Sequence, residues 1–147
     1  MSLLVVLGRF KVEGVPMAQA DPSLNLLVAW LWFTLGTVAG LVLGSFFHRK
    51  EWLGGYASVP RRMYRLGHIS FFGLGILNLL FYFTAGALVS PTPSLGLASW
   101  ALVVGAVTMP LCCALMAWST RFRLLFAIPV TGVLLGSILT LREVWLQ

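Results

Sequence analysis

Four apolar stretches dominate the pattern of this chain, and short polar segments separate them. Each stretch is close to the roughly 20 residues that a helix needs to cross the hydrocarbon core of a bilayer, which is about 30 Å thick. We therefore predict an all-α integral membrane fold, a bundle of four transmembrane helices. The predicted spans are residues 24–47, 69–89, 97–118 and 124–141.

The longest polar segment runs from His48 to His68, between the first two predicted spans, and it holds five of the ten Lys and Arg residues. The connection between the third and fourth spans adds two arginines. The segments on the other side carry only three basic residues, Arg9, Lys11 and Arg142. Because basic loops stay in the cytoplasm, we predict a basic cytoplasmic loop between helices one and two, with both termini outside (N-out and C-out).

The chain divides into an outward-facing N-terminal arm, residues 1–22, and a four-helix transmembrane domain, residues 23–147. Composition supports this division, because 59% of the 147 residues are hydrophobic and only 10% are charged. A soluble domain needs more charge on its surface. The net charge is +6, but the basic residues lie between apolar runs and do not form a nucleic-acid-binding face. We expect membrane lipids as partners, no nucleic acid, and a bacterial cytoplasmic (inner) membrane as the location.

Small and polar residues inside the spans indicate where helices pack. Helices in lipid gain little from the hydrophobic effect when they associate, so contacts depend on close approach of the backbones and on polar side chains. The candidates for packing are a glycine series in the first span, one amide in the second span and a glycine pair in the fourth. They are Gly36, Gly40, Gly44, Asn78, Gly132 and Gly136.

The two histidines are candidate ligands for haem b. His48 ends the first predicted span and His68 begins the second, so we expect both at one depth near the cytoplasmic face. Two histidines on facing helices can hold a haem iron from both sides. A simpler interpretation places both at the membrane interface beside a basic loop.

Three arginines follow in the same segment, Arg61, Arg62 and Arg65. A guanidinium group grips carboxylates in a bidentate manner, so these side chains are candidates for pairing with haem propionates. They are equally suited to anionic lipid headgroups. Setting the topology of the chain is sufficient by itself to explain them.

Sulfur-containing residues recur on one face of the third predicted helix, at Met109, Cys112, Cys113 and Met116. Thioether and thiolate groups are ligands for Cu(I), which makes this set a weak copper candidate. Met and Cys also fill gaps in ordinary apolar packing, and that interpretation needs no metal.

No charged residue falls inside a predicted span, and the motifs of phosphate loops, metalloproteases and paired catalytic carboxylates are absent from the sequence. We therefore favour a non-catalytic accessory or structural subunit of a larger membrane complex, bound to other membrane-protein subunits. A respiratory or photosynthetic electron-transfer complex is the expected setting. One alternative is a b-type haem protein that uses the two histidines. A second is a small-solute facilitator that uses Asn78, Tyr82 and Thr84.

Overall fold

The computed structural model describes residues 22–147. The expected N-terminal arm lies outside the described residues, apart from Pro22. Within the described part, four long helices follow one another: α2 (Ser23–Phe46), α3 (Val59–Ala87), α4 (Ser94–Trp118) and α5 (Ala127–Trp145). The short helices η2 (Trp52–Gly54) and η3 (Thr120–Phe126) lie in the connections.

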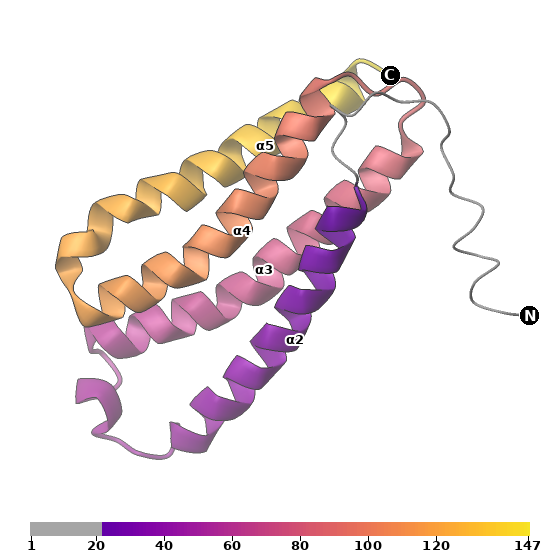
Figure 1. Cartoon of the computed structure of the whole chain (residues 1–147). Helices are drawn as coiled ribbons and strands as arrows, with labels where there is room; N and C mark the ends of the chain where they lie inside the picture. Colours follow the sequence, from indigo (N-terminus) through magenta and orange to yellow (C-terminus); the bar gives the residue numbers. More distant parts are fainter. Residues whose placement is uncertain (1–21) are drawn as a thin grey trace, which may run out of the picture.

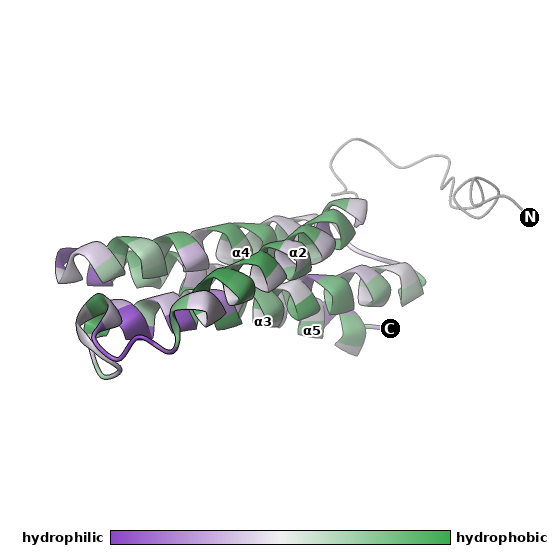
Figure 2. Cartoon of the chain, turned by 90° about the horizontal axis from the view of Figure 1, so that it is seen from below, coloured by the Kyte–Doolittle hydropathy of each residue, from purple (hydrophilic) through white to green (hydrophobic). Residues whose placement is uncertain are grey.

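The described residues are all-helical, and four of their helical segments are long and apolar enough to cross a membrane. The fourth segment counts η3 together with α5 and covers Thr120–Trp145. This confirms the predicted all-α fold with four candidate spans. Apolar residues cover the length of the helices, and polar residues gather at the end that carries the α2–α3 connection (Figure 2).

The four helices are arranged as a row in chain order (Figure 1). The extensive interfaces join α2 to α3, α3 to α4 and α4 to α5, whereas α2 and α4 touch over few residues. Helix α5 therefore packs mainly against one neighbour and leaves most of its apolar surface exposed. The start of α2 and the end of α5 lie at the same end of the molecule (Figure 1).

Helix α3 begins at Val59, ten residues before the predicted second span. The polar residues predict a loop over the whole segment between the histidines, whereas the structure shows that its second half is helical. Ser58 caps the helix, because its hydroxyl accepts a hydrogen bond from the backbone N–H of Arg61. Pro60 fits in the first turn, where no intrahelical N–H bond is needed. The chain reverses earlier, at Gly54 and Gly55, whose φ values of 80° and 89° suit glycine.

The glycines of α2 meet different surroundings. A Cβ atom built on Gly36 would lie 2.9 Å from the Phe72 ring, and one built on Gly40 would lie 2.9 Å from Nε2 of His68. Both glycines therefore pack against α3 within the chain. Gly44 has open space beside it. Gly36 and Gly40 thus bring α2 and α3 together over about one helical turn.

The interface between α4 and α5 is closer still, because glycines of both helices meet there. A Cβ on Gly132 would lie 3.0 Å from the carbonyl oxygen of Ala101 and 3.4 Å from the backbone nitrogen of Gly105. A Cβ on Gly136 would lie 2.6 Å from Cγ of Leu102 and 3.1 Å from the carbonyl oxygen of Ala98. Backbone against backbone is the packing that small residues permit in lipid.

We expect Gly136→Ala to destabilise the protein by about 1–3 kcal/mol, the usual cost of an overpacked contact. Leu102 cannot move aside easily, because it is 1% exposed. Thermal unfolding in detergent, followed by circular dichroism, measures the change. Gly73→Ala is the matched control, because its added methyl group meets nothing within 4 Å. Equal unfolding temperatures for the two variants would contradict the proposed close contact.

Candidate functional site

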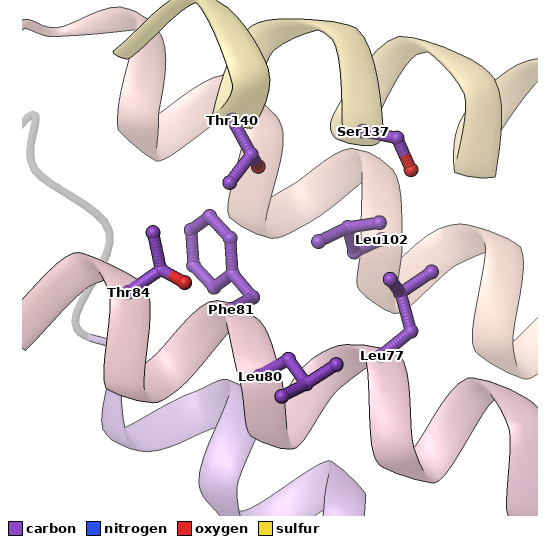
Figure 3. Close-up of a pocket in the computed structure, with 7 residues that line it drawn as sticks. All are labelled: Leu77, Leu80, Phe81, Thr84, Leu102, Ser137 and Thr140. Carbon is purple, nitrogen blue, oxygen red and sulfur yellow. The ribbon is translucent and has the colours of Figure 1, made fainter. Parts of the chain in front are cut away.

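A crevice opens between α3 and α5, with α4 behind it (Figure 3). It exists because both helices pack on α4 and form no extensive interface with each other. Its volume is about 160 Å³. The lining is mainly apolar with three hydroxyls. The lining residues are Leu77, Leu80, Phe81, Thr84, Leu102, Ser137 and Thr140.

Two of these hydroxyls differ from most others in the long helices. Most Ser and Thr hydroxyls there donate to a carbonyl oxygen three or four residues earlier in their own helix, which satisfies them inside a membrane. These residues are Thr34, Thr37, Ser45, Ser70, Thr108, Thr131 and Thr140. Within the described part of the chain, Ser137 and Thr84 make no such bond, and both are half-buried beside the crevice.

The crevice can therefore bind a group that offers apolar surface together with a hydrogen-bonding atom. Ser137 belongs to α5 and Thr84 to α3, so the two hydroxyls approach the opening from opposite walls (Figure 3). An unpaired polar group surrounded by lipid is costly, because the hydrocarbon core offers no water. A polar group on the occupant would remove that cost.

A separate polar network holds α2, α3 and α4 together. Asn25 donates from Nδ2 to Oδ1 of Asn78 at 2.8 Å, and the Ser99 hydroxyl donates to Oδ1 of Asn25 at 2.5 Å. Asn78 donates in turn to the carbonyl oxygen of Leu74 at 2.8 Å. The three side chains are buried. Asn78 therefore links α3 to α2. Of the three residues predicted for a facilitator, Asn78, Tyr82 and Thr84, only Thr84 lines the crevice.

Arg61 is buried in the first turn of α3, at the end of the bundle that holds the α2–α3 connection. Its side chain is 3% exposed and donates to the carbonyl oxygens of Phe47 and Lys50, at 3.2 and 3.3 Å. The guanidinium group also lies over the rings of Phe47, Trp52 and Tyr56, at 5.3–5.7 Å from their centroids. The last carbonyls of a helix lack intrahelical partners. Arg61 satisfies the carbonyl of Phe47, which caps α2, and through that of Lys50 it holds the connection in place.

Arg62 and Arg65 are placed differently from Arg61. Arg62 is exposed, and its side chain has no hydrogen bond or ion pair among the described residues. Arg65 is half-buried and stacks over Tyr56, with its Cζ atom 4.2 Å from the ring centroid. Stacking uses the face of the guanidinium group and leaves its N–H edge free for a further ligand.

The structure does not bring the two histidines together. His68 is half-buried between Gly40 and the ring of Phe72, whose centroid lies 5.5 Å from its own. His48 is exposed and follows the end of α2. Phe46, the last residue of that helix, already lies about 9 Å beyond Gly40 along the axis. The expected common depth therefore does not occur, since α3 begins earlier than predicted and carries His68 further into the bundle.

The sulfur-containing side chains of α4 are not brought together in one cluster either. Cys112 is buried and donates from Sγ to the carbonyl oxygen of Leu125, at 3.4 Å. Cys113 is buried against Gly67 of α3, so the two thiols face different neighbours. Met109 and Met116 are half-buried on the same helix. No group of three or more His, Cys, Asp or Glu side chains in residues 22–147 is arranged to hold a metal ion.

Glu143 lies beyond the fourth predicted span, and hydropathy does not predict that its side chain is buried. The side chain is fully buried and accepts hydrogen bonds from the backbone N–H of Thr92, at 3.0 Å, and from the hydroxyls of Thr92 and Ser94. A carboxylate beside a helix N-terminus is favourable, and Ser94 begins α4. The spacing from Gly132 and Gly136 was the available signal, because Glu143 falls on the same face of α5.

Residues 22–147 form an all-helical fold with four candidate membrane spans, buried polar contacts between helices and a lateral crevice. Comparisons with models of protein families, with curated proteins and with solved structures found no match for this chain.

We expect Asn78→Leu to destabilise the protein by about 1–2 kcal/mol, because it removes a buried interhelical hydrogen bond and leaves the Asn25 amide without an acceptor. Unfolding in detergent measures the loss. Thr108→Val is the control, since that hydroxyl bonds only within its own helix. Wild-type stability in Asn78→Leu would contradict the structural role.

We expect Arg61→Lys to loosen the connection between α2 and α3. A lysine ammonium cannot hold several carbonyls with one planar fork, and losing hydrogen bonds from a charged group costs about 1.5 kcal/mol or more. Backbone amide hydrogen exchange in residues 48–57 should then become about tenfold faster. Arg62→Lys serves as the control, because its side chain is exposed and unpaired in the described residues. Similar exchange in both variants would contradict this assignment.

Proposed function

We propose that this protein is a non-catalytic accessory subunit of a larger membrane complex, and that a transmembrane helix of a partner subunit packs over the crevice between α3 and α5 and places a side chain in it. The observation that carries the proposal is the pair of unpaired hydroxyls, Ser137 and Thr84, on opposite walls of an otherwise apolar opening. The one-sided packing of α5 supports it as well, because this helix has a free lateral face.

The chemistry of the crevice favours a helix over a lipid tail. An acyl chain supplies apolar surface but no donor or acceptor, so it would leave both hydroxyls unpaired. A partner helix can supply a Ser, Thr, Asn or Gln side chain at that level, and such interhelical bonds are a common means of association in membranes. The neighbouring wall residues, Leu77 and Leu80, give the same helix an apolar surface to pack against.

The wider setting follows from the sequence. We propose a bacterial cytoplasmic membrane, with the α2–α3 connection in the cytoplasm and both termini outside, because seven of the ten basic residues lie at the end of the bundle that holds this connection. An electron-transfer complex remains the proposed host. The two alternatives, a haem protein and a solute facilitator, stay predictions from the sequence and gain no supporting contact.

We expect Ser137→Leu to release the partner. The added carbons occupy the crevice and remove one hydroxyl, and a penalty of about 1–3 kcal/mol lowers the recovered partner about tenfold. The measurement is the stoichiometry of partner that co-purifies with the tagged protein from its native membrane in mild detergent.

Thr131→Leu is the matched control, because Thr131 is also on α5, is exposed and bonds to its own helix at Ala127. It should retain the partner fully. Two results would overturn the proposal. One is a wild-type protein that purifies alone. The other is equal recovery of the partner with both leucine variants.

A further inference from the structure

A shallow groove lies on the surface of α3, near the start of the helix. Its volume is about 390 Å³, and it is lined by Arg62, Met63, Arg65, Leu66 and Ile69. All five belong to the first three turns of the helix, where the polar connection gives way to the apolar span. The groove is separate from the crevice, whose lining on α3 begins at Leu77.

Charge is unbalanced around this groove. The same end of the described chain holds seven basic residues and a single acidic one, Glu51, which forms no ion pair among the described residues. Arg61 is buried and committed to carbonyl oxygens, so it is not part of the free charge. Arg62 and Arg65 remain available to a ligand, and Tyr56 fixes the position of Arg65 by stacking.

The groove changes character along the helix. Arg62 and Arg65 lie at the polar end of the groove. Ile69 is 63% exposed and lies about 10 Å from Arg62 along the helix axis, toward the apolar part of α3. Leu66 lies between them on the same side. A ligand that fits both parts needs an anionic group at the polar end and a hydrocarbon chain that continues toward the bilayer centre.

We propose that this groove binds one anionic phospholipid. Its phosphate pairs with the guanidinium groups of Arg62 and Arg65, and an acyl chain lies over Leu66 and Ile69. Guanidinium groups pair with phosphate through parallel N–H bonds, which makes arginine suitable for this contact. Arg61, which the sequence alone could not distinguish from its neighbours, has no part in the site. The inference does not depend on the proposed partner helix.

Binding of phosphatidylglycerol to the purified full-length protein in neutral detergent tests the proposal, with native mass spectrometry to count retained lipids. We expect one retained lipid, and phosphatidylcholine should bind much more weakly. Arg62→Gln should lower the affinity about fivefold and Arg62→Gln/Arg65→Gln about 25-fold, which corresponds to about 1 kcal/mol per basic residue. The single variant guards against misfolding, because the Arg62 side chain is exposed.

Arg121→Gln/Arg123→Gln is the matched control, because it removes the same charge from two exposed arginines in η3. It should change the affinity less than about twofold, since the proposed contacts remain. Equal losses in both double variants would show a diffuse electrostatic attraction and overturn the site. Inorganic phosphate is the second arm. Competition by phosphate at the lipid's own concentration would show an anion site without an acyl chain, and would overturn the lipid assignment.

Discussion

Association of the helices depends on contacts that do not require the hydrophobic effect, because lipid tails are as apolar as the side chains they would replace. Two kinds of contact meet this constraint here. Glycines at positions 105, 132 and 136 let α4 and α5 approach with backbone against backbone. The buried amides of Asn25 and Asn78 and the Ser99 hydroxyl link α2, α3 and α4 by hydrogen bonds. The glycine contacts and the Asn25–Asn78 bond join helices that follow one another in the chain, whereas the Ser99–Asn25 bond joins α4 to α2.

Each end of the bundle, taken along the helix axes, holds one buried charged side chain among the described residues. Arg61 lies at one end and Glu143 at the other. Arg61 donates to the carbonyl oxygen of Phe47, the cap residue of α2, where the helix leaves acceptors unpaired, and to that of Lys50 in the connection. Glu143 accepts hydrogen bonds from the backbone N–H of Thr92, just before α4, and from the hydroxyls of Thr92 and Ser94. Each charge agrees with the sign that a helix terminus prefers. The α2–α3 connection is therefore fixed by the helix that follows it, whereas the α3–α4 connection is fixed by α5, which comes after α4 in the chain.

Hydropathy predicts the four spans because a membrane helix must be apolar over a fixed length. It could not predict where α3 begins, since Pro60 both ends helices and starts them, and the Ser58 cap becomes evident only in the structure. It also missed Glu143, because a carboxylate beyond an apolar run is normally exposed. The crevice depends on how α3 and α5 sit on α4, and no periodicity within one helix contains that information.

The crevice and the basic groove occupy one side of α3. Steps of three and four residues connect Arg62, Leu66 and Ile69 of the groove with Leu77 of the crevice through Gly73, so these positions lie on one helical face. Gly73 is exposed, and a Cβ atom built on it would meet no atom within 4 Å. A lipid chain that extends down the groove therefore runs toward the crevice. A helix bound in the crevice and a lipid bound in the groove would contact each other along α3, and the lipid would contribute to the surface that the partner meets.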